Sequence, residues 1–273
     1  MQDFSISPKE MIAVFWRNIS LIYTLAKREV VGRYRGSIMG IAWSFFNPLI
    51  MLIIYTFVFS VVFKARWGVS TQESKIDFAI MLFIGMIIHG LFAECVNRAP
   101  GLILSNVNYV KKVVFPLDIL PYVAFGSALF HAIVSLLVLI SVQLIFMGYI
   151  PLTALLFPVV LLPLVFATIG FAWLLSSLGV FVRDIGQITG IFTTVLLFIS
   201  GVFFPISGLP EPYRTWMALN PLADIIEEGR NVLVLGILPD PVNWCFMTAI
   251  GLLIAWAGFA WFQKTRKGFA DVL

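Results

Sequence analysis

Long apolar segments separated by short polar ones run along most of this chain of 273 residues. Six of them, 38–63, 78–96, 117–147, 152–182, 185–204 and 244–262, follow a charged N-terminal stretch. The apolar run 113–182 is too long to cross a hydrocarbon core of about 30 Å only once, so we expect it to turn at 148–151. The pattern predicts an all-α integral membrane protein with six transmembrane helices, the fourth kinked at Pro158 and Pro163.

Residues 1–37 predict an amphipathic helix that lies along the cytoplasmic surface of the membrane. Ser7, Pro8 and Glu10 form a helix start with a capping box. The helical wheel places Glu29 close to the apolar side, whose members are Met11, Phe15, Ile19, Ile22 and Ala26. Such a helix suits the headgroup plane of a bilayer. A soluble helix packed on a partner protein is the alternative.

Segment 205–243 is too charged to span a membrane and too apolar for a free loop. Asn220 and Pro221 divide it into two short apolar stretches. Irregular backbone is tolerated at membrane depth only where it lies against protein or a water-filled cavity. We therefore expect two short re-entrant helices that dip into the membrane from the periplasmic side.

Composition and charge exclude a soluble domain and orient the chain. Only 12% of the residues are charged and 60% are hydrophobic, whereas soluble domains carry about a quarter charged residues. One face collects 13 of the 18 Lys and Arg residues, which predicts that both termini are cytoplasmic. The expected organisation is an interfacial helix over 1–37, one six-span domain over 38–264 and a cytoplasmic tail over 265–273.

The candidate residues favour a transport protein over an enzyme. The sequence contains no G-x-x-x-x-G-K-[ST] loop, so the driving energy must come from elsewhere. We expect no catalytic residue, no metal site and no cofactor in this chain. His131 is taken as the one ionisable residue deep in a span, where a neutral histidine hydrogen-bonded to a neighbouring helix is favoured over a proton relay. Glu94 and Arg98 stand one helical turn apart and are expected to pair.

Two groups of residues are candidates for contact with a transported molecule. Thr189, Thr193 and Ser200 share one side of the fifth segment, with Phe204 close by. Uncharged hydroxyls beside an aromatic ring suit a glycan, but helix packing explains them equally well, and Gly186 and Gly190 favour packing. In the first segment the candidates are Trp43, Phe46 and Asn47, which share one face with Phe57. Aromatic residues also occupy its other side, so the pattern leaves open which face lines a pore.

The junction before the first segment and the loop 98–116 supply two more candidate sites. Arg33, Tyr34 and Arg35 could meet an anionic headgroup or a pyrophosphate, although anchoring to anionic lipid explains them too. Glycines at 32, 36 and 40 predict close approach between helices. In the loop, a short helix bounded by Pro100 and Pro116 would project Asn106, Val107, Tyr109, Val110, Lys111 and Lys112 toward a groove on another protein. A solvated connector is the alternative.

Four motifs, R-Y-R-G-S at 33–37, F-N-P-L at 46–49, F-V-R-D-I-G-Q at 181–187 and N-P-L at 220–222, occur in order over nearly the whole chain. They resemble the permease family of polysaccharide-export ABC transporters, which serves O-antigen, capsule and teichoic acid. The resemblance implies a homodimer with two ATPase subunits that hold ATP and Mg, and a channel at the dimer interface lined mainly by the first and fifth spans. It implies a coupling helix in 98–116, and it strengthens Arg33, Tyr34 and Arg35 as an entrance for a lipid-pyrophosphate-linked glycan.

The resulting prediction is a permease in the bacterial inner membrane that exports a lipid-linked polysaccharide, with O-antigen ahead of capsule or teichoic acid. Its partners are a second copy, two ATPase subunits, the glycan and membrane lipids, and no nucleic acid. A membrane-embedded transferase acting on polyprenyl-linked sugars is a rival, but Asp118 and Asp184 are poorly suited to it by number and separation. A secondary transporter or channel would need an intramembrane charge or an inverted repeat, and neither is found.

Overall fold

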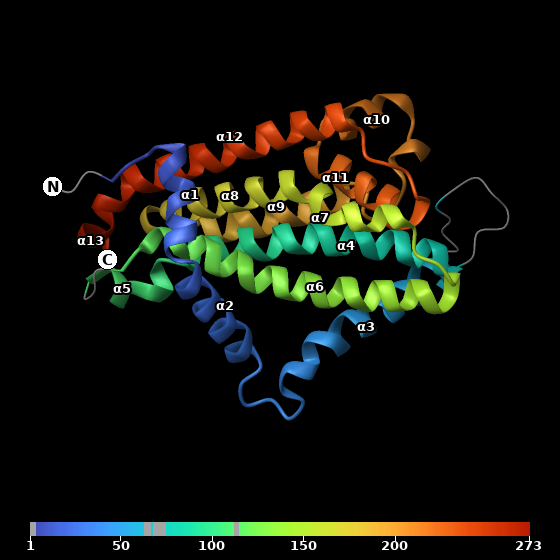
Figure 1. The fold of residues 1–273 in the computed structure, drawn as a ribbon, viewed down its shortest axis with the longest axis horizontal. Coiled ribbons are helices and arrows are strands. Elements are labelled where there is room, and N and C mark those ends of the chain that lie inside the picture. The colour runs from blue at the N-terminus through green and yellow to red at the C-terminus, as the bar shows by residue number, and fades with distance from the viewer. Residues whose placement is uncertain (1–3, 63–66, 68–74, 112–114) are drawn as a thin grey trace.

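The computed structural model describes residues 4–62, 67, 75–111 and 115–273 and contains no strand within them. The α-helices are α1 (Pro8–Arg17), α2 (Ile19–Arg33), α3 (Trp43–Tyr55), α4 (Lys75–Arg98), α5 (Val107–Lys111), α6 (Leu120–Met147), α7 (Phe157–Val160), α8 (Leu162–Phe181), α9 (Ile185–Ile199), α10 (Glu211–Ala218), α11 (Pro221–Arg230), α12 (Pro241–Thr265) and α13 (Phe269–Val272). The long helices α4, α6, α8 and α12 run side by side in an elongated bundle (Figure 1). The described part of the chain is therefore all-α, as predicted.

Five helical segments are long and apolar enough to cross a membrane: Gly40–Phe59, Ile76–Gly101, Leu117–Met147, Leu152–Phe181 and Pro241–Val272. They correspond to the first four and the sixth predicted segments. The predicted kink in the fourth is confirmed, because the helix is interrupted at Leu161, between α7 and α8.

The fifth predicted segment is shorter than expected. Helix α9 ends at Ile199 after 15 residues, which is about 22 Å at 1.5 Å per residue. The prediction of a helix to residue 204 is wrong because Gly201 turns the backbone with a φ of +65°. The side chain of Ile206 lies only 2.8 Å from where a Cβ on Gly201 would be, so the turn is tightly packed.

The N-terminal stretch forms two helices rather than one. The Ser7 hydroxyl caps α1 by accepting a hydrogen bond from the Glu10 backbone N–H at 3.1 Å, as predicted. The Glu10 carboxylate binds Arg17 at 2.9 Å instead of closing a capping box. The helix is interrupted at Asn18, where φ is −113°. Met11 on α1 and Ile22 on α2 are buried against the bundle.

The two ends of the bundle carry different elements. Both termini lie at the same end as α5, and α10 and the end of α6 lie at the other (Figure 1). The two short helices expected in 205–243 are present as α10 and α11, and Asn220 between them caps α11 by accepting from the Leu222 backbone N–H at 3.0 Å. Helix α4 lies at the centre of the bundle and is its most buried candidate span. The candidate sites are therefore arranged around α4.

Candidate functional site

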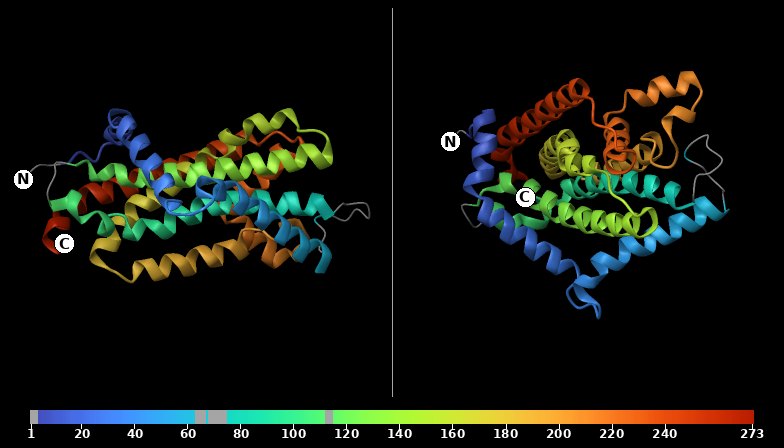
Figure 2. Two further views of the ribbon diagram at one scale, coloured as in Figure 1. Left: turned by 90° about the horizontal axis from the view of Figure 1, so that it is seen from below. Right: turned by 45° about the vertical axis from the view of Figure 1, so that its right-hand side comes forward.

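The connection between α2 and α3 is a sharp elbow. The two helices form a V whose vertex points away from the bundle (Figures 1 and 2). Gly36 and Gly40 adopt φ values of +86° and +53°, and a Cβ added to either would meet no atom within 4 Å. Within the described part of this chain, these glycines therefore bring no other helix close. They supply the left-handed backbone that the turn requires.

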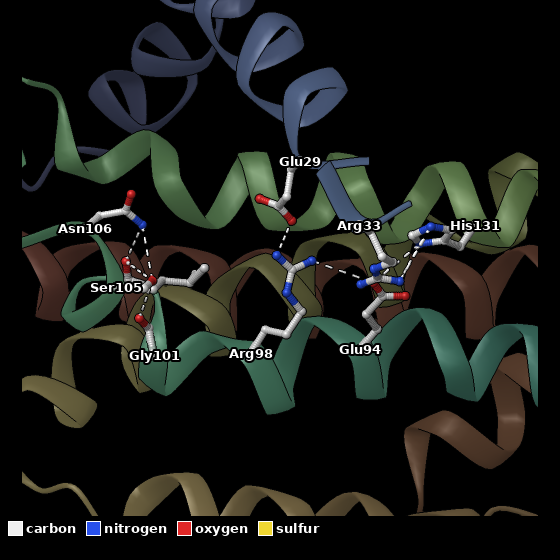
Figure 3. Close-up of polar contacts among 9 residues, drawn as sticks. Glu29, Arg33, Glu94, Arg98, Gly101, Ser105, Asn106 and His131 are labelled. Carbon is white, nitrogen blue, oxygen red and sulfur yellow. Dashed lines mark hydrogen bonds and ion pairs between the residues drawn. The ribbon is translucent and has the colours of Figure 1, made fainter. Parts of the chain in front are cut away.

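A cluster of charged side chains joins α2 to the bundle beside this elbow (Figure 3). Arg33 pairs with Glu94 of α4, and Glu29 pairs with Arg98 of the same helix. The expected pairing of Glu94 with Arg98 is present at 3.6 Å. His131 of α6 lies 3.4 Å from the Glu94 carboxylate and 3.1 Å from the Arg33 guanidinium. The expectation that His131 bonds to a neighbouring helix is thus confirmed.

The contribution of α2 to this cluster was missed by sequence reasoning. The sequence feature that could have revealed it is Glu29, whose carboxylate lies close to the apolar side of an amphipathic helix. A carboxylate in that position needs a partner when the apolar side is covered. His89 was missed as well. It is 7% exposed in α4 and its Nε2 lies 2.9 Å from the Thr193 carbonyl, so His131 is not the only histidine deep in a span.

A cavity of about 280 Å³ opens among α3, α4 and α6, next to the charged cluster. Its polar lining consists of Arg33, Tyr34, Ser44, Asn47, Tyr55, Glu94, His131 and Ser135. Burial raises the pKa of the Tyr34 hydroxyl, and Glu94 raises it further although Arg33 opposes both, so Tyr34 is a hydrogen-bond donor at neutral pH. Such a lining can hold the hydroxyl or phosphate oxygens of a polar ligand.

The two arginines of the elbow have different surroundings. Arg33 is already neutralised by Glu94. Arg35 is exposed and has no ion pair within the described part of the chain. Arg35 is therefore the cation that is available to an anion, whereas Arg33 can receive one only by sharing its contacts with Glu94.

The α3 candidates remain accessible. Trp43, Phe46 and Asn47 are exposed, and Asn47 also lines the cavity. At the far end of this segment, the Phe59 ring stacks on Phe203 with centroids 5.4 Å apart, and Phe203 contacts Phe198 of α9 at 5.5 Å. The first and fifth segments therefore meet through aromatic rings at the end of the bundle opposite α5.

The hydroxyl stripe of α9 faces its own bundle. Thr189, Thr193 and Ser200 are at most 3% exposed. The Thr193 hydroxyl donates to Asn97 Oδ1 at 3.1 Å, and Ser200 accepts from the Asn220 amide at 2.9 Å. For the single chain, this placement favours helix packing over contact with a glycan as the role of the three hydroxyls. Phe204 is half-buried. The exposed side of α9, which lies along one edge of the bundle in Figure 2, is mainly apolar and carries Gln187 and Thr194 as polar residues. Its large hydrophobic residues are Ile188, Ile191, Phe192, Val195, Phe198 and Ile199.

The loop after α4 contains two short turns and α5, which runs from Val107 to Lys111. Tyr109 and Val110 are half-buried and do not project from the bundle. The Tyr109 ring stacks on Phe115 with centroids 4.3 Å apart, and both Tyr109 and Val110 pack against a buried apolar cluster that includes Ile103 and Phe269. Asn106 and Val107 are also half-buried, and Asn108 is exposed. Lys112 lies outside the described residues.

Comparison with known proteins identifies the family. The model of the ABC-2 type transporter family matches residues 20–234. The chain is 26% identical over 253 residues to the O-antigen export system permease protein RfbA of Myxococcus xanthus, which covers 92% of this chain and 94% of that protein. It is 23% identical to RfbA of Klebsiella pneumoniae, covering 93% and 95%, and 24% identical to the polysialic acid transport protein KpsM of Escherichia coli, covering 90% and 93%. Because the family model spans more than half of its length, the chain belongs to the ABC-2 type transporter family.

Proposed function

We propose that this protein is the membrane-spanning permease of an ATP-driven exporter that moves a lipid-linked polysaccharide, O-antigen first among the candidates, out of the cytoplasm. The observation that carries the proposal is its similarity to named O-antigen export permeases over more than nine-tenths of both chains. Capsule polysaccharide is the second candidate substrate, because KpsM and the capsule export protein CtrC of Neisseria meningitidis are also similar.

The proposed working unit is two copies of this chain with two ATPase subunits in the bacterial inner membrane. Each copy would use six crossings, with α9 and the turn after it as the fifth and with α10 and α11 entering from the periplasmic side. Both termini and α5 would then face the cytoplasm. The shared position of the termini and α5 at one end of the bundle supports this orientation.

The substrate path would begin at the elbow and end at the aromatic rings between α3 and α9. The available guanidinium of Arg35 and the cavity beside Arg33 and Tyr34 would receive the anionic linkage and the first sugars of the glycan. Trp43, Phe46 and Asn47 would line the path, and the opposed flanks of α3 and α9 in two copies would enclose it. In this arrangement Thr189, Thr193 and Ser200 would support the wall from behind, with Phe204 at its outer end.

Complementation tests the function. In cells that lack this permease but keep its ATPase partner, the chain should restore surface polysaccharide, and an ATPase partner unable to hydrolyse ATP should abolish the restoration. The purified chain alone should hydrolyse no ATP. Surface glycan that persists without an active ATPase would refute the proposal.

The coupling role of α5 can be tested at Asn108, an exposed residue of this helix. Asn108→Trp adds bulk where the fold has room, so it should lower co-purification of the ATPase subunit and export together, while the amount of permease in the membrane stays unchanged. Thr215→Trp, on the exposed surface of α10 at the other end of the bundle, is the matched control. Normal ATPase binding by Asn108→Trp would exclude α5 as the docking element.

A further inference from the structure

Helices α2 and α4 carry the same charge pattern and meet through it. Each has a glutamate followed four residues later by an arginine, namely Glu29 and Arg33 on α2 and Glu94 and Arg98 on α4. Residues four apart lie on one face of a helix. The pairs are Glu29 with Arg98 and Arg33 with Glu94, so the helices cross in antiparallel fashion and each acid faces a base (Figure 3). We call these four residues the charge zipper.

The charge zipper is more than a surface ion pair. Its side chains are 22–41% exposed, and the contact from Arg98 to Glu94 at 3.6 Å joins the two pairs into one network. His131 extends the network to α6. Partly buried charges are screened less by salt than exposed ones, and a network contributes more than an isolated pair. The Arg17–Glu10 pair of α1, with Arg17 62% exposed, is a suitable contrast.

The charge zipper lies between the loop that carries α5 and the elbow. Arg98 is the last residue of α4, and the chain continues from it through two turns into α5. The Arg28 guanidinium of α2 donates a hydrogen bond to the Tyr109 hydroxyl of α5 at 3.1 Å. At its other end α2 leads directly into Arg33, Tyr34 and the cavity. Thus α2 contacts α5 through Arg28, and the C-terminal end of α2 leads into the elbow.

We propose that the charge zipper makes α2 a rigid lever, which carries a displacement of α5 to the elbow and its cavity. Glu29, Glu94, Arg98 and His131 are then positioning residues, since they act through Arg33 and the elbow and need not touch the glycan themselves. The inference rests on the proposed function, because the ATPase partner supplies the displacement. It adds the route by which ATP hydrolysis reaches the substrate entrance.

Charge reversal and charge exchange test the lever in the assembled transporter. Glu29→Arg and Arg98→Glu each place like charges face to face, so each should reduce the glycan exported per ATP hydrolysed on the order of tenfold, within the range of coupling between contacting charges. The double exchange, Glu29→Arg with Arg98→Glu, brings opposite charges together again between α2 and α4 but removes the attraction between residue 98 and Glu94, so it should restore export in part. Permease in the membrane and ATP hydrolysis should stay near wild type in all three. Arg17→Glu is the control and should export normally.

The possible outcomes separate the lever from its alternatives. Normal export by both single variants would overturn the inference. So would a parallel loss of membrane permease, hydrolysis and export that the exchange does not repair, because the charges would then serve only the fold. If the wild-type chain itself fails to restore export, the proposed function is at fault and not the lever.

Discussion

At the scale of single residues, Arg230 shows how one buried side chain can hold three segments. It is 1% exposed, and its guanidinium donates to the carbonyls of Met81, Gly201 and Val202 at 3.0–3.1 Å. Arg230→Met would leave these carbonyls without a donor and should lower the free energy of unfolding by at least about 3 kcal/mol. Unfolding of the detergent-solubilised protein would measure the loss, with Arg214→Met on the exposed surface of α10 as the control. Equal stability of the two variants would contradict this role.

Residue contacts could be predicted from the sequence when both partners lie on the same stretch of helix. The Ser7 cap and the pairing of Glu94 with Arg98 depend on local spacing alone, and both are present. The contacts of Arg33 with Glu94 and of Thr193 with Asn97 depend on which helices touch. A helical wheel shows which residues share a face, but it does not show what covers that face.

At the scale of elements, glycines set how closely α8 and α12 pack. A Cβ on Gly258 would lie 2.1 Å from the carbonyl oxygen of Gly170, whereas one on Gly190 of α9 would meet nothing within 4 Å. Gly258→Leu should therefore force the two helices apart, cost more than about 3 kcal/mol and nearly abolish folded protein in the membrane. Gly190→Leu is the matched control and should accumulate normally. Membrane-fraction immunoblotting and melting in detergent would measure both, and normal accumulation of Gly258→Leu would refute the packing argument.

The apolar segments were predictable because hydrophobic length alone decides whether a helix can cross a membrane. The break at Leu161 was predictable because Pro163, two residues further on, has no backbone N–H to donate in a continuous helix. The end of α9 at Ile199 was not, since the sequence remains apolar to Phe204 and the stop comes from the left-handed turn at Gly201. The break at Asn18 was hidden for a similar reason, because the amphipathic pattern runs through it.

At the scale of the whole molecule, the exposed apolar flank of α9 is a surface that either lipid or the proposed second copy would cover. Ile191 is 68% exposed and Phe198 57% exposed, whereas the adjacent hydroxyl side chains are already covered, Thr193 by Asn97 of α4 and Ser200 by Asn220. If this flank lies at the dimer interface, Ile191→Cys in a Cys245→Ser background should cross-link into a dimer in native membranes. The remaining Cys95 is buried and should not react. Leu253→Cys on α12, which is 60% exposed, is the control and should stay monomeric. Cross-linking at residue 253 but not at 191 would move the interface to α12 and remove α9 from the proposed channel wall.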